Sequence, residues 1–175
     1  MKKRIIVDMD EVMADVLGAM ELWYKERYAA PIDYDRMKEG SLVKGFPEEV
    51  QPIMRQRLFE PGFFRHLPVM ANSQEVLKAI NDKYELFIVS AATEFPNSLK
   101  DKMEWLNDHF PFISWRQLVL CGDKKLVTGD VMIDDHGRNL VHFHGEKWLY
   151  HAPHNVLVTE YERVMDWEEI GKRLL

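Results

Sequence analysis

Short hydrophobic runs alternate with amphipathic segments along most of this chain. Residues 5–7, 84–90 and 131–134 are rich in β-branched and other apolar side chains, as is typical of strands that a parallel sheet buries on both faces. Weaker patterns predict three more strands, at residues 117–121, 147–151 and 156–158. Because helical segments separate these strands, the pattern predicts an α/β fold built on one parallel sheet.

The segments between the strands have a helical period. Val16, Met20 and Tyr24 recur at four-residue steps, which predicts an amphipathic helix soon after the first strand. Pro47 predicts the start of a helix that runs to residue 59, and the polar residues 72–75 resemble a capping box. Further helices are expected at residues 33–37, 72–83, 96–109 and 167–175.

The long interval between the first two main strands predicts an insertion. Residues 16–69 contain helical patterns and loops, but no strand pattern. We therefore predict a core domain made of residues 1–15 and 70–175, with a Rossmann-like parallel sheet, and a small helical cap at residues 16–69. A chain of 175 residues with 46% hydrophobic content is long enough for one core and such a module.

The first two main strands end in side chains suited to phosphate and metal chemistry. Asp8 and Asp10 follow the first strand two residues apart, so both carboxylates can point to the same side. Asp8 could attack phosphorus and share a hard cation such as Mg²⁺, while Asp10 could handle a proton. Ser90 ends the second strand, and the small Ala91 after it allows a backbone N–H group to approach a phosphate.

The same kind of chemistry follows later in the chain. Lys124 lies in a loop between two hydrophobic runs, and the paired acids Asp134 and Asp135 end the next strand. The carboxyl ends of parallel strands meet at one edge of a sheet, so these groups are expected together. The order Asp-x-Asp, Ser, Lys, Asp-Asp resembles the four motifs of the haloacid dehalogenase (HAD) superfamily of phosphatases, and the resemblance covers essentially the whole chain.

Longer phrases are similar to one family within that superfamily, the 5'(3')-deoxyribonucleotidases. They lie at residues 7–15, 61–64 and 122–135, and the last is the most specific because it places a Lys at a long, fixed distance before the acid pair. The chain departs from the family pattern at Glu11, where Gly is common, and at Ala91, where a second hydroxyl is frequent. The resemblance implies a Mg²⁺-dependent phosphomonoesterase of nucleoside or deoxynucleoside monophosphates, acting through an aspartyl-phosphate.

The resemblance also implies roles for individual residues. Asp8 is expected as the nucleophile and Asp10 as the general acid and base, and Asp8, Asp10 and Asp135 as the metal ligands. Asp134 is the second choice for the metal, and otherwise orients Lys124 or a metal-bound water.

The phosphoryl group is expected to meet a further set of donors. Ser90, the backbone of Ala91 and the ammonium of Lys124 would bind its oxygens. Lys125 is the rival of Lys124. Lys124 is preferred because its distance to Asp134 and Asp135 matches the family spacing, which leaves Lys125 as a solvent-facing neighbour, the usual place of a Lys.

Aromatic residues in or beside the cap are candidates for contact with a base. Phe63 and Phe64 lie where the chain returns to the core, and the resemblance implies that this stretch borders the nucleoside pocket. Trp23 and Phe46 are further candidates, although most such rings simply pack the interior of a cap. The seven His residues show no spacing typical of a zinc site, so no His ligand is predicted.

Composition limits the partners and the compartment. A net charge of −6 and a pI near 5.7 exclude a basic footprint for nucleic acid polymers, so the expected substrate is a small phosphate ester. No signal pattern and no run of about 20 apolar residues is present, which predicts a cytoplasmic protein without membrane contact. The single Cys121 excludes an internal disulfide. A homodimer is among the assemblies that the sequence allows.

Two other functions use similar residues. A HAD phosphatase for another metabolite, such as a sugar phosphate, would share the core chemistry and differ only in its cap. A phosphoacceptor signalling domain also uses acids, a hydroxyl, Lys and Mg²⁺, but such domains place the acid pair first and the Lys last. Here the Lys precedes the acid pair, which disfavours that reading.

Overall fold

One parallel sheet forms the centre of the molecule. The computed structural model describes residues 2–175, and its sheet has the strand order β3-β2-β1-β4-β5-β6 with every pair parallel. The predicted α/β fold is therefore confirmed. The strands are β1 (Arg4–Val7), β2 (Glu85–Ser90), β3 (Leu118–Leu120), β4 (Val131–Asp134), β5 (Glu146–Tyr150) and β6 (Glu162–Val164).

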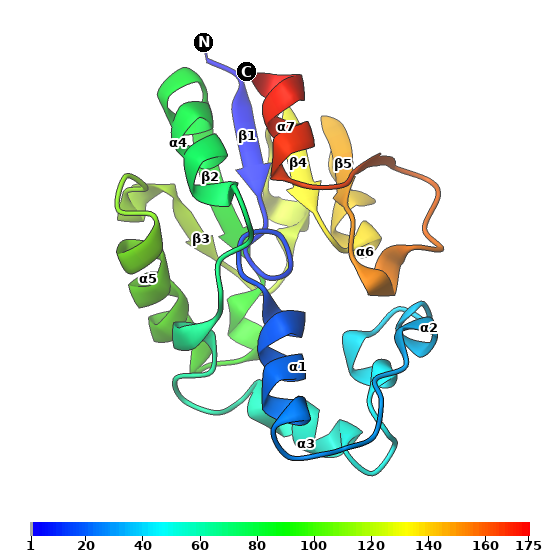
Figure 1. The fold of residues 1–175 in the computed structure, drawn as a ribbon. Helices are drawn as coiled ribbons and strands as arrows, with labels where there is room; N and C mark the ends of the chain where they lie inside the picture. The colour runs from blue at the N-terminus through cyan, green and yellow to red at the C-terminus, as the bar shows by residue number, and fades with distance from the viewer. Residues whose placement is uncertain (1) are drawn as a thin grey trace.

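Helices cover the two faces of this sheet (Figure 1). Side chains of β1 alternate, so Ile5 and Val7 join one hydrophobic cluster and Ile6 joins the other. Leu140 of α6 packs in the cluster of Ile6, and the other three core helices, including α7 with Ile170, pack in the larger cluster. The core helices are α4 (Ser73–Lys83), α5 (Ser98–His109), α6 (Gly137–Leu140) and α7 (Trp167–Leu174).

The helices of the segment 16–69 lie beyond the carboxyl end of the sheet (Figure 1). They are α1 (Val16–Lys25), α2 (Tyr34–Met37) and α3 (Gln51–Arg57). This group has an interior of its own, in which the rings of Tyr24 and Phe46 meet edge to face with centroids 5.2 Å apart. The final part of the segment lies along α5, where the Trp105 indole N–H donates to the carbonyl of Leu67 at 2.7 Å.

The chain enters and leaves this segment side by side. Ala14 and Val69 form an isolated antiparallel bridge. The N–H of Asp15 donates to the carbonyl of Pro68 at 2.9 Å, and the N–H of Met70 donates to the carbonyl of Met13 at 2.8 Å. Two short stretches of chain, paired by backbone hydrogen bonds, therefore join the helices of the segment to the sheet.

Three predicted details were wrong. Residues 156–158 form a turn rather than a strand, and the edge strand is β6, which pairs only with β5. Helix α3 begins at Gln51 rather than at Pro47, with Pro52 in its first turn. Asn72 has a φ of 63° and its side chain does not cap α4, so the predicted capping box is replaced by a left-handed turn.

Candidate active site

The ends of β1, β2 and β4 meet at a cavity of about 390 Å³ between the sheet and the helices α1–α3. Asp8, Asp10, Ala91, Lys124 and Asp135 line it from the side of the sheet. Its apolar lining includes Val16, Met20, Leu42, Val43, Leu58 and Phe64, and further polar groups come from Ser41, Glu94 and Arg138. Most of the sequence-predicted groups therefore line one cavity, whereas Ser90 and Asp134 are buried and are not part of its lining.

Asp8 is buried at the end of β1 and pairs with Lys124. The Lys124 ammonium lies 2.6 Å from Asp8 Oδ1 and 2.7 Å from Asp134 Oδ2, so one cation joins both carboxylates. Burial and the nearby Asp134 raise the pKa of Asp8, whereas Lys124 lowers it. Burial alone would lower the pKa of Lys124, but Asp134 and Asp8 raise it, so Lys124 stays charged.

Asp134 is fully engaged in holding this pair. Its Oδ1 accepts hydrogen bonds from the backbone N–H of His136 and from the Asn139 amide, both at 2.9 Å, while its Oδ2 faces Lys124. The two Lys candidates differ in their surroundings. Lys124 is buried between the acids, whereas Lys125 is exposed and pairs with Asp123 at 2.8 Å.

Asp135 points the other way, toward the cavity, and is buried. Its backbone carbonyl accepts a hydrogen bond from the Asn155 amide at 2.7 Å, and its Oδ1 has no hydrogen-bond partner within residues 2–175. Burial raises the pKa of Asp135, but His154, His136 and Lys124 together lower it to about 2. An ionised, unpartnered carboxylate oxygen inside the protein is suited to a cation.

A second buried Lys, which the sequence analysis missed, serves Asp10 and Ser90. Lys102 of α5 is 1% exposed, and its ammonium donates to Asp10 Oδ2 at 2.5 Å and to Ser90 Oγ at 2.8 Å. It also lies 4.5 Å from the centre of the Phe64 ring. A Lys in an amphipathic helix normally faces water, so the local pattern gave no signal of this role.

Glu11 occupies the loop directly after Asp10. Its φ of 56° lies in the left-handed region, which explains why Gly is common at this place in the resembled family. The buried carboxylate lines the cavity and accepts a hydrogen bond from the N–H of Leu17 at 2.7 Å. Burial, the main cause, raises the pKa of Glu11 to about 8.

The aromatic candidates divide between two places. Phe64 lines the cavity with the acids, whereas Phe63 and Trp23 line a separate hollow of about 410 Å³. Trp23 is stacked there beneath Arg57, whose guanidinium lies 4.5 Å from the ring centre. Phe46 is 1% exposed and packs against Tyr24 in the interior of the segment 16–69. Of the four rings, Phe64 is the one that meets the cavity of the acids.

The oxygen atoms at the cavity fit a divalent metal ion. Asp8, Asp134 and Asp135 each offer a carboxylate oxygen within 4.8 Å of the others. Asp134 is already bound to Lys124 and Asn139, which leaves Asp8 and Asp135 as the better donors. Asp10 Oδ1 is a further buried oxygen without a hydrogen-bond partner in the described part of the chain. Carboxylate oxygens of this kind suit hard cations.

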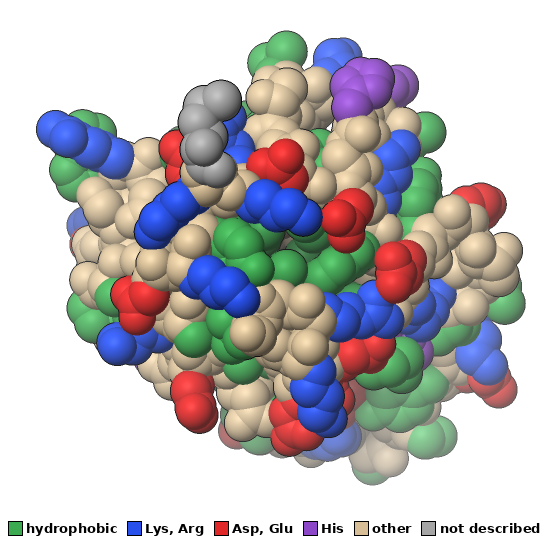
Figure 2. Space-filling model, turned by 90° about the horizontal axis from the view of Figure 1, so that it is seen from above, with side chains coloured by type: hydrophobic (Ala, Val, Ile, Leu, Met, Phe, Trp, Pro, Cys, Tyr) green, Lys and Arg blue, Asp and Glu red, His purple; other side chains and the backbone are tan. Residues whose placement is uncertain are grey.

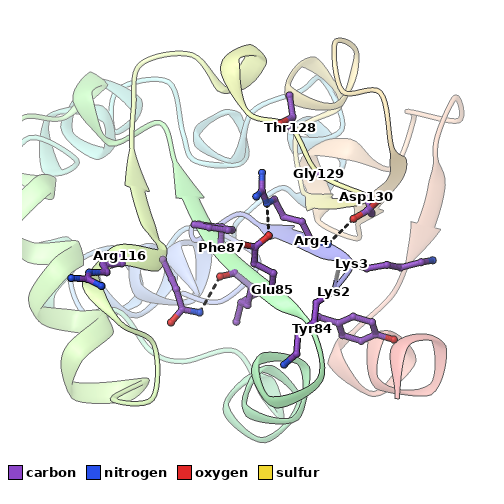
Figure 3. Close-up of a pocket in the computed structure, with 12 residues that line it drawn as sticks. Lys2, Lys3, Arg4, Tyr84, Glu85, Phe87, Arg116, Thr128, Gly129 and Asp130 are labelled. Carbon is purple, nitrogen blue, oxygen red and sulfur yellow. Dashed lines mark hydrogen bonds and ion pairs between the residues drawn. The ribbon is translucent and has the colours of Figure 1, made fainter.

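A larger cavity lies elsewhere, at the amino ends of β1 and β2, with a volume of about 820 Å³ (Figure 3). On this face Lys and Arg side chains surround a hollow with hydrophobic side chains in its floor (Figure 2). Some charged groups of this hollow have partners within the protein. The Arg4 side chain donates from Nε to Glu85 at 2.8 Å, and the backbone N–H of Arg4 donates to the Asp130 carboxylate at 2.6 Å. The motif residues all lie at the opposite edge of the sheet.

Within residues 2–175, no helix has the length and apolar character needed to cross a membrane.

Solved structures with the same fold are HAD proteins. The HAD hydrolase YfnB from Bacillus subtilis, bound to magnesium, superposes with a TM-score of 0.57 at 12% identity, covering 99% of this chain and 98% of that one. The L-2-haloacid dehalogenase PA0810 superposes with a TM-score of 0.56 at 10% identity, covering 99% of both chains. At such identities the likeness establishes the HAD fold alone.

Sequence relatives are much closer. The 5'(3')-deoxyribonucleotidases of Bacillus subtilis (strain 168) and of Bacillus phage SPbeta are each 41% identical over 179 residues, covering 100% of both chains. The family model described as 5' nucleotidase, deoxy (pyrimidine), cytosolic type C protein matches residues 2–175. Because both comparisons span the described chain and its motif residues share one cavity, this protein belongs to the 5'(3')-deoxyribonucleotidase family of the HAD superfamily.

Proposed function

We propose that this protein hydrolyses nucleoside and deoxynucleoside monophosphates with the help of Mg²⁺. The observation that carries the proposal is the pairing of each Asp-x-Asp carboxylate with a buried ammonium group. Lys124 lies 2.6 Å from Asp8, and Lys102 lies 2.5 Å from Asp10 and 2.8 Å from Ser90. The two fixed cations offset the negative charge of the two acids, so that a phosphate dianion can approach them.

Asp8 acts as the nucleophile in this proposal. Its carboxylate oxygen attacks phosphorus, the bond between phosphorus and the nucleoside oxygen breaks, and an aspartyl-phosphate forms. Lys124 keeps the attacking group in place, since Asp134 anchors the same ammonium from the other side. Lys102, Ser90 and the backbone of Ala91 hold the oxygens of the phosphoryl group.

Asp10 moves the proton. In the first step it protonates the departing nucleoside oxygen, and in the second it takes a proton from the water that attacks the aspartyl-phosphate. That attack releases phosphate and restores Asp8. Such a positioned acid and base typically contributes roughly 10²–10⁴-fold to a rate.

The carboxylates of Asp8 and Asp135, together with the backbone carbonyl of Asp10, would hold Mg²⁺. The unpartnered Oδ1 of Asp135 supports this assignment, as far as residues 2–175 are concerned. When bound, the ion supplies positive charge that makes the phosphorus easier to attack.

The segment 16–69 acts as the cap in this proposal and selects the leaving group. The apolar lining of the cavity comes mainly from this segment and includes Phe64. An apolar space beside a phosphate site suits a nucleoside better than a bare sugar, because a base offers a flat apolar surface and a sugar does not. This contrast favours nucleotides over sugar phosphates.

Paired variants test the proposal. Asp8→Asn should abolish both turnover and labelling of the protein by ³²P from substrate, because no nucleophile remains. Asp10→Asn should lose roughly 10²–10⁴-fold on deoxynucleoside monophosphates but much less on an aryl phosphate, whose leaving group needs no proton.

A screen of phosphate esters in Mg²⁺ tests the substrate class. A value of kcat/KM for deoxynucleoside monophosphates at least tenfold above that for sugar phosphates is expected. Equal rates on both classes would contradict the nucleotide assignment, and equal losses of the two Asp variants on both ester types would contradict their separate roles.

A further inference from the structure

His154 is buried in the wall of the cavity without ordinary partners. It lies in the short turn Pro153–Asn155, is 4% exposed, and neither of its ring nitrogens has a hydrogen-bond partner within residues 2–175. Leaving a buried polar group unpaired costs about 1–3 kcal/mol. A side chain held at such a cost indicates a ligand that satisfies it.

His136 and Asp135 complete a group around His154. His154 Nε2 lies 3.2 Å from Asp135 Oδ2, and His136 Nε2 lies 3.8 Å from the same oxygen. The two imidazole rings are 4.4 Å apart at their centres. One atom from each of the three side chains therefore lies within 4.8 Å of the other two.

These separations suit ligands of a common ion, and the orientation of the rings, rather than the distance, argues against a hydrogen bond. Although His154 Nε2 and Asp135 Oδ2 are close, the ring nitrogen does not point at the oxygen well enough to form a hydrogen bond. Ligands with bonds of about 2.0–2.2 Å to one ion lie roughly 3.0–3.8 Å from each other. An ion placed between the three atoms would use the Nε2 directions that the carboxylate leaves unused.

We propose that Asp135 Oδ2, His136 Nε2 and His154 Nε2 form a second metal site, which binds a transition ion of the Zn²⁺ and Co²⁺ class. Imidazole nitrogens favour such ions, whereas Mg²⁺ prefers oxygen. The proposal rests on the proposed function in one respect: Asp135 would bridge the two sites, with Oδ1 toward Mg²⁺ and Oδ2 toward the second ion.

The backbone around the proposed site is held in place. The Asn155 amide donates to the carbonyls of Asp135 and Tyr150, both at 2.7 Å, which ties the turn of His154 to the end of β4. Arg163 fixes Asn155 in turn by donating to its Oδ1 at 2.6 Å. A metal site needs such support, because ligands must be placed before the ion arrives.

The site also opens to the cavity. Asp135, His136 and His154 all line it, and the His136 side chain is 35% exposed. Three protein ligands leave at least one position for water or an anion, as in zinc sites that are not purely structural. A transition ion could therefore enter from the same side as the substrate.

Cobalt titration in excess Mg²⁺ tests the proposal. CoCl₂ is added to the Mg²⁺-saturated protein, and binding is followed by visible absorption and by equilibrium dialysis. We expect one Co²⁺ per chain, with the intense absorption of a four- or five-coordinate ion. His154→Gln and His136→Gln should each weaken binding at least tenfold, whereas His144→Gln, at an exposed residue, should not change it.

Two results would overturn the proposal. One is complete displacement of Co²⁺ by Mg²⁺, which would mean a single shared oxygen site. The other is Co²⁺ binding by both His variants as tight as by His144→Gln, in which case His154 merely packs against Asp135. Should His154→Gln fail to fold, His136→Gln at the half-exposed position decides alone. Nucleotidase activity of the wild-type protein is measured separately. If the wild-type protein binds Co²⁺ as expected but hydrolyses no nucleotide, the proposed function is contradicted and this site is not.

Discussion

Lys124 and Lys125 are neighbours in the chain but lie in opposite surroundings. Lys124 is buried between Asp8 and Asp134, while the Lys125 side chain is 57% exposed beside Asp123. Removal of the Lys124 charge would leave two buried carboxylates without their cation, whereas an exposed ion pair contributes little.

The two positions provide a matched pair of variants. Lys124→Met should lower the free energy of unfolding by roughly 3–5 kcal/mol and abolish activity, while Lys125→Met should change stability by less than about 0.5 kcal/mol. Urea unfolding of both variants at neutral pH measures the difference. A loss of similar size in the two variants would show that Lys124 does not balance the acids.

Phe63 and Phe64 provide a second matched pair, on the side of the leaving group. Phe64 borders the cavity, and Phe63 lies on the other hollow. Phe64→Leu should lower kcat/KM for deoxynucleoside monophosphates by about tenfold, since stacking of a base is worth ~1–3 kcal/mol. Phe63→Leu should lower the melting temperature and leave kcat/KM nearly unchanged.

An aryl phosphate separates the two roles of the Phe64 ring. If Phe64→Leu loses as much on this small substrate as on a nucleotide, the ring acts by holding Lys102, whose ammonium lies 4.5 Å from its centre. A loss confined to nucleotides would assign the ring to the base.

At the scale of elements, helix α1 begins with two caps. Asp15 Oδ1 accepts from the N–H of Gly18, and Glu11 Oε1 accepts from the N–H of Leu17, both at 2.7 Å. The second cap reaches from the loop that follows Asp10, so the start of α1 is tied to the end of β1. Glu11 provides this bond from a left-handed backbone position that favours Gly.

Variants of Glu11 separate the cap from the backbone strain. Glu11→Gln keeps an acceptor for Leu17, whereas Glu11→Gly removes it and relieves the strain, so the two effects of the Gly variant on stability should offset to within about 1 kcal/mol. The N–H of Leu17 should nevertheless exchange with deuterium roughly tenfold faster in Glu11→Gly than in Glu11→Gln. Asp15→Ala, which gains nothing in return, should cost about 1 kcal/mol. Equal exchange rates in the two Glu11 variants would contradict the second cap.

The strands differ in how well the sequence alone predicts them. The central strands β1, β2 and β4 were predictable because burial on both faces requires an unbroken apolar run. Edge strand β6 was missed because its residues Glu162 and Arg163 face solvent or polar neighbours. The nearby apolar residues 156–158 mimicked a strand.

The residues of the candidate site also differ in how well the sequence predicts them. Asp8, Ser90 and Asp135 were predictable because they stand at or next to strand ends, and Lys124 because it lies in the loop between β3 and β4, in a recognisable order with them. Lys102 and His154 come from a helix and a turn, so only the tertiary fold brings them to the cavity. Their polar character alone gave no reason to expect that both are almost completely buried.

At the scale of the whole molecule, acidic groups are concentrated at one edge of the sheet. Asp8, Asp134 and Asp135 lie together there, in a protein of net charge −6. An ion that binds only this folded arrangement stabilises it by about 2.7 kcal/mol at a concentration of 100 times its Kd. Mg²⁺ should therefore raise the melting temperature by several degrees, and EDTA should reverse the shift and abolish turnover.

Calorimetry at a series of Mg²⁺ concentrations measures this effect. Asp135→Asn should lose most of the shift because it weakens the site, whereas Asp123→Asn, on the exposed loop, should keep it. A wild-type melting temperature that does not respond to millimolar Mg²⁺ would contradict the assigned metal ligands.

The paired backbones at Ala14 and Val69 have a consequence for how such enzymes diversify. Because the chain leaves the sheet and returns to it at adjacent points, whatever lies between can change in length or shape while the strand ends stay in register. The segment between these points could thus be exchanged in evolution while Asp8 and Asp10 keep their places at the end of the sheet. If this segment selects the leaving group, as proposed above, one such exchange would change the substrate while the strand ends keep their chemistry.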